Sequence, residues 1–348
     1  MSLSRGYRNY RGRTPKWKVI LAAVLVLVIL AAGAVILLQQ YIVYDETGTP
    51  HLRLPASETA DPAAEEPEQQ VELTIQEPEK EQTAIYAFTV PDTPLTVQGW
   101  KDAWMGAAAM SAPAYNAAVV TVKDSGGLVY FDSSTAVSGS TRTAEDTALA
   151  LTAMTGEDSS YYTVARLSCF HDPKAANADV EGLGLKNTGG YIFYDGNNSQ
   201  WLDPAKPAAR AYLCQMIKET AELGFDEILL TDVSYPTEGK LDKIAYGDGN
   251  RTQHLLDFLT EARAVLEPYG AVLSIELPEQ VLTAGSDENA GLSLTKIAPL
   301  VDRVYATTTP EQTAALAALV TAAGEQTTFV PELESYGPEI TGSCVLLK

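Results

Sequence analysis

The chain contains few cysteines and histidines, and their spacing matches no known cofactor or disulfide pattern. Of its 348 residues, three are cysteines and three are histidines. No two cysteines form a CxxC pair, and the odd number excludes the even set of a disulfide-stapled domain. No two histidines lie at metal-ligand spacing. We therefore expect no metal and no cofactor, and we expect Cys169 and Cys214, which lie in apolar periodic segments, to be buried thiols.

Two catalytic signatures are also missing from the sequence. It has no G-x-S-x-G segment, which would place a nucleophilic serine on a sharp turn, and no glycine-rich phosphate loop. The sequence therefore gives no support for a serine hydrolase or for a nucleotide-binding protein.

The chain has fewer basic than acidic residues. The chain has 24 Lys and Arg against 45 Asp and Glu, and a formal net charge of −21. Six of the basic residues fall within the first 18 positions, so the rest of the chain is more acidic still. Such a charge argues against nucleic acid or an anionic surface as a partner.

Charge is absent from Val19 to Leu38, a run of twenty almost entirely apolar residues. This is about the length needed to cross a bilayer. The sequence predicts a single-pass membrane anchor over 19–41, with residues 1–18 in the cytoplasm because basic flanks stay inside. A cleaved signal peptide is the alternative, but it would need a shorter apolar core and a small-residue cleavage site.

Large apolar residues are rare between 42 and 83, where Glu, Pro, Gln and Ala dominate. A segment of this composition cannot bury enough apolar surface to fold, so we expect a disordered acidic linker. The remaining residues, 84–348, are numerous enough to form one large core. The sequence thus predicts an extracytoplasmic domain tethered to a membrane.

From residue 84 onwards, segments of strand and helix character alternate. In the clearest unit, a helix begins at Asp203-Pro204 and ends at Gly224, and an apolar strand follows over 226–233. Asp232 lies near the C-terminal end of that strand. In an α/β barrel or a doubly wound sheet, ligands bind at this end of the strands.

The complete pattern favours the barrel. The expected strands are 85–90, 117–123, 161–169, 226–233, 271–277, 303–307, 327–333 and 344–347. The other expected helices are 99–112, 143–154, 252–266, 294–300 and 310–323, and a long irregular loop covers 170–200. Only 336–343 separates the last two strands, which is too short for a regular helix. The sequence therefore predicts a (β/α)8, TIM-barrel-like fold with an abbreviated C-terminal unit.

Several blocks carry a family resemblance. They are NAAVVTVKDSGGLVYFDS (116–133), VARLSCFHDP (164–173), WLDP followed by AELGFDEI (201–228), and LEPYGAVLSIEL (266–277). Together they resemble the glycoside-hydrolase-like (β/α)8 barrel domain of bacterial surface proteins. The resemblance spans 84–348 and implies a polysaccharide or other glycan as the partner. It says nothing about protein partners.

Glycoside hydrolysis usually requires two carboxylates across the scissile bond. Strand alternation puts Ser274 and Glu276 on one face at the barrel mouth, and the family pattern also has an acid at Glu276. The family's other acid falls at Thr231, so Asp232 is shifted by one residue and can serve only if the strand has already ended. We predict Glu276 and Asp232 as the catalytic pair. The alternatives are a surface glutamate and a cap or loop aspartate.

Further residues at the strand ends are candidates for substrate binding. Lys123 and Arg166 could each contact substrate or form a structural ion pair with a neighbouring acid. Asp124 follows Lys123, and Glu332 is the reserve carboxylate. The family pattern has an acid at Thr121, so this chain lacks a second motif acid there.

Aromatic side chains often bind the apolar faces of sugars. Trp201, Tyr235 and Tyr305 fall in or next to loops on the expected side of the barrel, although only a cluster would indicate a sugar platform. The family carries a basic residue where this chain has Ser234, and a longer aromatic loop after Tyr305. Part of the binding cleft is therefore expected to be missing.

Two functions remain open from the sequence. One is a membrane-anchored, extracytoplasmic glycoside hydrolase acting on a polysaccharide of the cell envelope or surroundings. The other is a catalytically degenerate barrel that binds glycan or scaffolds envelope proteins. The second function remains open because this chain has Thr121 and Thr231 where the family pattern has acids.

Overall fold

The structure is a computed structural model that describes residues 42–44, 50–52 and 84–347, apart from 92, 110–113, 157–158, 160, 248, 338–339 and 341. The predicted cytoplasmic segment and anchor, 1–18 and 19–41, lie outside the described residues, as does most of the predicted linker. Within that linker, β1 (Ile42–Tyr44) pairs antiparallel with β2 (Pro50–Leu52). None of the described helices is long and apolar enough to span a membrane.

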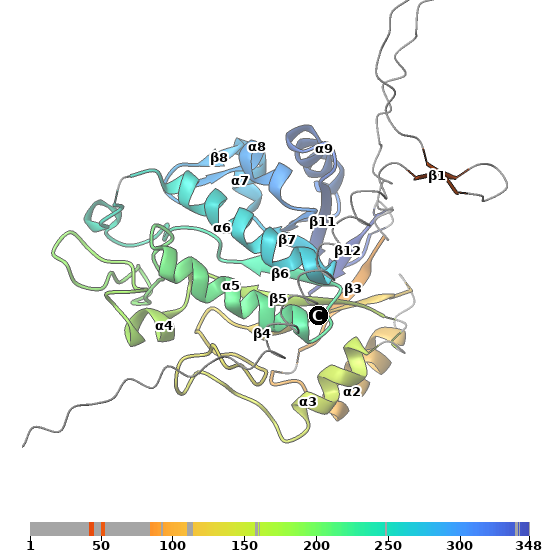
Figure 1. The fold of residues 1–348 in the computed structure, drawn as a ribbon. Helices are drawn as coiled ribbons and strands as arrows, with labels where there is room; N and C mark the ends of the chain where they lie inside the picture. Colours follow the sequence, from red (N-terminus) through yellow and green to blue (C-terminus); the bar gives the residue numbers. More distant parts are fainter. Residues whose placement is uncertain are drawn as a thin grey trace, which may run out of the picture. The chain divides into compact units, whose positions relative to one another are not determined.

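Residues 80–348 form one compact unit, whose described part is built around a closed parallel barrel of eight strands (Figure 1). In spatial order the strands are β3 (Tyr86–Thr89), β4 (Ala117–Lys123), β5 (Tyr162–Ser168), β6 (Glu227–Thr231), β7 (Val272–Glu276), β10 (Arg303–Thr307), β11 (Thr328–Leu333) and β12 (Cys344–Leu346). β12 pairs with both β11 and β3, which closes the barrel. The predicted barrel and its eight strands are confirmed.

Helices cover the outside of the barrel. They are α2 (Val97–Ala108), α3 (Thr147–Thr155), α4 (Pro173–Ala178), α5 (Pro207–Glu222), α6 (Arg251–Leu266), α7 (Glu279–Ala284), α8 (Leu294–Ile297) and α9 (Thr313–Ala323), with short 3-10 turns at Leu241–Lys243, Glu267–Tyr269 and Ala298–Leu300. Figure 1 shows α5 and α6 lying side by side against β6 and β7. The described residues between β11 and β12 contain no helix, as expected for an abbreviated unit.

Several local expectations differ from the structure. The helix predicted over 143–154 begins at Thr147. The helix predicted to begin at Asp203-Pro204 begins at Pro207, because Asp203 accepts instead from the amide of Ala205 (3.0 Å) in a tight turn. The loop predicted over 170–200 contains α4. After β7, α7 and a small hairpin of β8 (Ser286–Asp287) and β9 (Leu292–Ser293) were not predicted.

Side-chain alternation along the strands separates two cores. On β6, Ile228 and Leu230 point outward and pack beneath the helices, whereas Leu229 points into the barrel. All three are fully buried. Cys169 and Cys214 are buried free thiols, as predicted, and Cys344 is buried as well.

A buried ionic network fills the N-terminal half of the barrel. The carboxylate of Glu227 accepts from Arg303 Nη1 (2.6 Å), Tyr305 Oη (2.6 Å), Ser274 Oγ (2.5 Å) and Tyr162 Oη (2.9 Å). Glu227 is inaccessible to solvent, so these four donors satisfy a charge that would otherwise be costly to bury. Because side chains fill this half of the barrel, a site inside the barrel is expected at the opposite, C-terminal mouth.

Candidate active site

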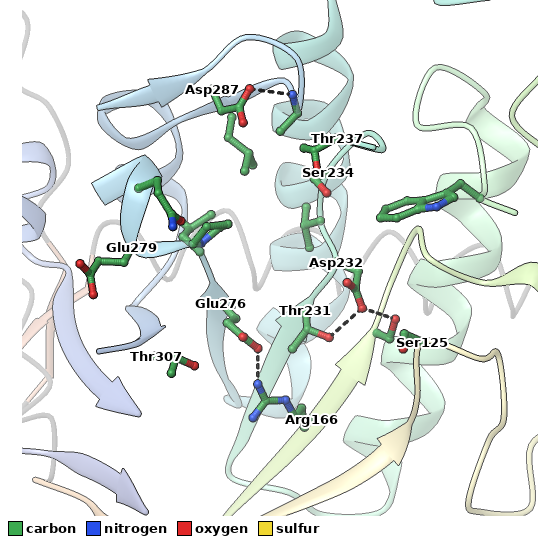
Figure 2. Close-up of a pocket in the computed structure, with 18 of the residues that line it drawn as sticks. Ser125, Arg166, Thr231, Asp232, Ser234, Thr237, Glu276, Glu279, Asp287 and Thr307 are labelled. Carbon is green, nitrogen blue, oxygen red and sulfur yellow. Dashed lines mark hydrogen bonds and ion pairs between the residues drawn. The ribbon is translucent and has the colours of Figure 1, made fainter. Parts of the chain in front are cut away.

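A cavity of about 820 Å³ opens at the C-terminal mouth of the barrel. Its walls come from the ends of β4, β5, β6, β7 and β10, and from the segments that follow β6 and β7 (Figure 2). The volume and the position are typical of small-molecule sites in barrels of this kind.

Glu276 is the last residue of β7 and lines the cavity. Its side chain is 27% exposed. Burial raises the pKa of this carboxyl to about 7, and the charges of Glu332 and Asp232 act in the same direction. Arg166 opposes the rise by donating to Glu276. A carboxyl with this pKa is still partly protonated near pH 7, whereas an ordinary glutamate is ionised there.

Arg166 links Glu276 to a second, deeper carboxylate. Its two terminal nitrogens donate to Glu332 Oε1 (2.8 Å) and Oε2 (3.3 Å), and one of them also donates to Glu276. The Glu332 side chain is fully buried and is not among the cavity-lining residues. The structural ion pair considered for Arg166 is therefore present, and Glu332 serves as its buried partner.

Asp232 could serve only if its strand had already ended, and the structure meets this condition. β6 ends at Thr231, and the backbone of Asp232 takes a φ of +53°, a left-handed conformation uncommon for residues other than glycine. This bend turns the side chain into the cavity, where it accepts from Ser168 Oγ (2.6 Å) and Thr231 Oγ1 (3.4 Å). Figure 2 shows Asp232 and Glu276 on either side of Thr231. The structure thus brings the two predicted acids to one cavity.

Lys123 lines the cavity, but its ammonium group is buried and paired, so the structure favours the structural ion pair over the predicted substrate contact. Its ammonium group donates to the carbonyl of Ser168 (2.8 Å) and pairs with Asp172 (3.0 Å), and both charged side chains are buried. Asp172 also accepts from the amide of Ala175 (2.9 Å) at the start of α4. Lys123 therefore ties β4 to β5 and α4, which is the structural alternative.

A glycine completes this packing. Gly127 has a φ of +75°, and a Cβ added to it would lie 2.3 Å from Asp172 Oδ1. The turn after β4 can approach the buried ion pair only because this residue has no side chain.

Asp124 lines the cavity, but its oxygens are used by its own loop. Oδ1 accepts from the amides of Gly126 (2.9 Å) and Leu128 (2.8 Å), and Oδ2 accepts from Tyr130 Oη (2.7 Å). These hydrogen bonds fix the turn after β4. Asp124 therefore forms part of the cavity wall.

The two predicted tyrosine contacts are wrong. Tyr235 is fully buried and its hydroxyl is hydrogen-bonded to His254 Nδ1 (2.8 Å), away from the cavity. Tyr305 is fully buried inside the barrel and donates to Glu227. Tyr235 follows the end of β6 by four residues and Tyr305 is the middle residue of β10, and both side chains point into packed interior instead of into the cavity.

Trp201 is the single aromatic residue among the described residues that line the cavity. Its ring is stacked on His171, with a centroid separation of 4.4 Å and an interplanar angle of 3°. The indole Nε1 donates to Asp195 Oδ2 (2.8 Å). Trp201 is 8% exposed, so little of its ring is open to a sugar, and no second aromatic residue among the described lining residues extends it into a platform.

Several lining residues were not predicted from the sequence. They are mostly short polar side chains, together with two acids from the segment after β7: Ser125, Ser168, Thr237, Thr307, Glu279 and Asp287. Thr121 and Thr231 also line the cavity, at the positions where the family pattern has acids. Among the described residues no group of His, Cys, Asp and Glu is arranged to hold a metal ion.

The chain resembles several solved structures. One is a "hypothetical protein" from Ruminiclostridium thermocellum ATCC 27405, with 27% identity, coverage of 55% of this chain and 96% of that chain, and a TM-score of 0.46. Another is the PgaB (BpsB) glycoside hydrolase domain from Bordetella bronchiseptica (16%, 72% and 83%, TM-score 0.48). A third is a cycloisomaltooligosaccharide glucanotransferase from Paenibacillus sp. (12%, 72% and 38%, TM-score 0.51), which supports the barrel fold alone.

A comparison with curated proteins finds no match. The family described as "Putative glycosyl hydrolase domain" matches residues 106–316, more than half of the chain. This range includes Asp232 and Glu276, and it covers β4 to β10. The chain therefore belongs to this family of glycosyl hydrolase-like barrel domains.

Proposed function

We propose that the barrel hydrolyses glycosidic bonds in a polysaccharide of the cell envelope or surroundings, using Glu276 and Asp232. The observation that carries this proposal is the pair itself. Two carboxylates from neighbouring strands line one cavity, and their surroundings differ. Glycoside hydrolysis needs such a difference, because one acid must hold a proton while the other is ionised.

Glu276 has the surroundings of the general acid. Burial and the nearby acids raise its pKa to about 7, so it can give a proton to the leaving oxygen of the glycosidic bond. Once deprotonated, the carboxylate is stabilised by the Arg166 guanidinium that donates to it. Arg166 therefore limits how far the pKa of Glu276 rises, and it keeps the carboxylate oriented between turnovers.

Asp232 is the second carboxylate. Its Oδ2 accepts from two neutral hydroxyls, on Ser168 and Thr231, and within the described part of the chain no cation donates to its carboxylate. It acts across the scissile bond from Glu276, either as the nucleophile or as the base that activates water. A carboxyl separation of about 5 Å corresponds to retention of configuration, and about 6.5–9.5 Å corresponds to inversion.

One observation favours a second function, glycan binding without hydrolysis. Thr121 and Thr231 occupy the positions of two family acids, and both line the cavity. A barrel that had lost catalysis would keep its cavity, its hydroxyls and Trp201 while lacking those acids.

The proposed function can be tested with the full chain on a panel of bacterial and plant polysaccharides. The chain is assayed for new reducing ends beside Asp232→Asn and Glu276→Gln. Glu267→Gln, which changes an exposed acid in a 3-10 turn, controls for the loss of one charge. Cleavage that is lost in both site variants and kept in the control supports hydrolysis. Binding without cleavage, unchanged in Asp232→Asn, supports the second function.

We also propose that Val19–Leu38 anchors the chain in a bilayer, with the amino terminus in the cytoplasm and the barrel outside. The six basic residues before Val19 and the uncharged run support this orientation. Protease added to intact cells should release a barrel fragment by cutting within 45–83. A barrel that stays protected while the amino terminus is cut would reverse the orientation.

A further inference from the structure

A guanidinium lies against the carboxyl that is proposed to give the proton in hydrolysis. Arg166 donates to Glu276, and Figure 2 shows the two side chains in contact at the mouth of the barrel. A cation in this position favours the ionised form of a carboxyl and typically lowers its pKa by about 1–3 units. Arg166 alone would therefore hold Glu276 in the form that has no proton to give. Another group must offset the charge of Arg166.

Glu332 is that group. Its Oε1 accepts from Arg166 Nη1 (2.8 Å) and its Oε2 accepts from Nη2 (3.3 Å), so the contact is bidentate. Bidentate contacts between arginine and a carboxylate are among the strong ion pairs. The Glu332 side chain is fully buried, and a buried carboxylate keeps its charge only beside such a partner. Glu332 is therefore the ionised member, and it neutralises Arg166.

Glu276 receives less compensation. Its Oε2 accepts from Arg166 Nη2, the same nitrogen that also donates to Glu332, and its side chain is 27% exposed. Burial raises the pKa of Glu276, and so do the charges of Glu332 and Asp232. One cation thus serves two carboxyls, and the less compensated of the two holds the proton.

Strand alternation brings the three groups together. Arg166, Glu276 and Glu332 each lie two residues beyond a buried side chain that points into the barrel: Val164, Ser274 and Val330. Side chains two apart on a strand share a face, so all three charged groups point inward at the C-terminal end. β5 and β11 lie on opposite sides of the ring of eight strands, so the ion pair between Arg166 and Glu332 crosses the barrel.

The other titratable groups on the surrounding elements have their own partners. On β4, Lys123 is buried in an ion pair with Asp172, and on β10, Tyr305 donates to Glu227. On α7, Glu279 accepts from a threonine hydroxyl, and Figure 2 shows its carboxylate directed away from Glu276. The remaining acids of the cavity wall, apart from Asp232, accept from amides of their own turns: Asp124 and Asp287.

Resting on the proposed function, we propose that Glu332 is a positioning residue for hydrolysis: by neutralising Arg166 from inside the barrel, it leaves Glu276 able to hold the proton that passes to the leaving oxygen. Glu332 acts through Arg166, because its own side chain is fully buried and does not line the cavity. These three residues together set the upper pH limit at which the barrel can cleave a glycosidic bond.

Infrared spectroscopy of the full chain can follow this proton, because a protonated carboxyl has a C=O stretch that a carboxylate lacks. The difference between wild type and Glu276→Gln should contain such a band, which disappears as pH rises through about 7. In Glu332→Gln, compared with the double variant that adds Glu276→Gln, the band should disappear about 1–3 pH units lower. An unchanged titration in Glu332→Gln overturns the proposal.

The rate on a cleaved polysaccharide gives a second readout. In Glu332→Gln the fall of kcat with rising pH should move to lower pH by the same amount, which lowers kcat at pH 7 at least about fivefold. On the acidic side of this fall kcat should approach that of the wild type, and KM should change little. A loss of kcat by the same factor at every pH would indicate a merely structural role and overturn the proposal.

Matched variants separate charge from packing. Glu332→Asp keeps the negative charge and should stay closer to the wild-type pH profile than Glu332→Gln does. Glu334→Gln removes a charge from an exposed acid two residues further along that does not line the cavity, and it should change neither readout. Shifts of equal size in Glu334→Gln and Glu332→Gln would overturn the specific role of Glu332.

A double variant tests the same point if Glu332→Gln does not fold. Arg166→Met with Glu332→Gln removes both charges, so the band of Glu276 should titrate within about one unit of its wild-type position, because the two charges offset each other. A band that moves further than this to higher pH would show that Glu332 does not offset Arg166.

The outcomes separate this inference from the proposed function. If Glu332→Gln leaves the infrared titration and the pH profile unchanged while the wild type cleaves a polysaccharide, the inference fails and the hydrolase stands. If no polysaccharide on the panel is cleaved, the proposed function fails, and the role of Glu332 in the reaction fails with it.

Discussion

The guanidinium of Arg166 donates to Glu276, the carboxyl that is proposed to donate the proton in hydrolysis. The same guanidinium also forms an ion pair with Glu332, whose side chain is fully buried. Three charged groups from β5, β7 and β11 therefore form one unit across the mouth of the barrel. The stability of the fold and the protonation of Glu276 should both depend on this unit.

Removing the cation of this unit should destabilise the domain. Arg166→Met leaves Glu332 buried without an ionic partner, and breaking a buried pair in this way typically costs about 3–5 kcal/mol. Urea unfolding of the variant should show this loss. The double variant with Glu332→Gln should recover part of it, because no uncompensated charge remains. A change of less than about 1 kcal/mol in Arg166→Met would contradict a buried, structural role.

Stability should depend on pH through Glu276. Its pKa is about 7 in the folded domain against an ordinary value of 4.5, so between these values the folded state binds more protons than the unfolded state. The free energy of unfolding contributed by Glu276 is therefore largest below about pH 4.5 and decreases as pH rises towards about 7. Thermal unfolding of Glu276→Gln across this window should lack that decrease, with Glu267→Gln as the control. Parallel pH profiles for wild type and Glu276→Gln would show that the shift is absent.

The outward-facing side chains of β6 should contribute strongly to stability. Leu230 is fully buried beneath the helices, and Leu230→Ala should cost about 2–5 kcal/mol because it leaves a cavity in a packed layer. Ile228→Ala should behave similarly. Leu319→Ala, at a position that is 41% exposed on α9, serves as the matched control and should cost far less. Equal losses at Leu230 and Leu319 would contradict the packing described for this face.

The strands were predictable because each is a short, mostly buried run with glycine or polar residues at its ends. The beginning of α5 was less clear, since Pro204 and Pro207 both suit a first helical position. The sequence pattern does not show that the turn at Asp203 makes the helix begin at Pro207 instead of Pro204. Helix α4 and the β8–β9 hairpin were missed because short elements carry little periodic signal.

The direction of side chains at the barrel mouth was much harder to predict. Alternation along β7 placed Glu276 correctly, because a regular strand fixes which face each side chain takes. Asp232 lies one residue beyond its strand, and its direction depends on a φ of +53° that no sequence pattern shows. The pairing of Lys123 with Asp172 joins residues distant in sequence, as does the pairing of Glu227 with Arg303. Such contacts appear only once the barrel is closed.

The most direct test of the two-carboxylate account is the pH dependence of kcat on whichever polysaccharide is cleaved fastest. The account predicts that kcat falls as pH rises through about 7, because Glu276 loses the proton it must donate. Glu276→Gln should lose at least about 10²-fold in kcat, while its melting temperature stays close to that of the wild type at acidic pH, where Glu276 is protonated. A Glu276→Gln variant that keeps the wild-type rate and pH profile would contradict the assignment of Glu276 as the general acid.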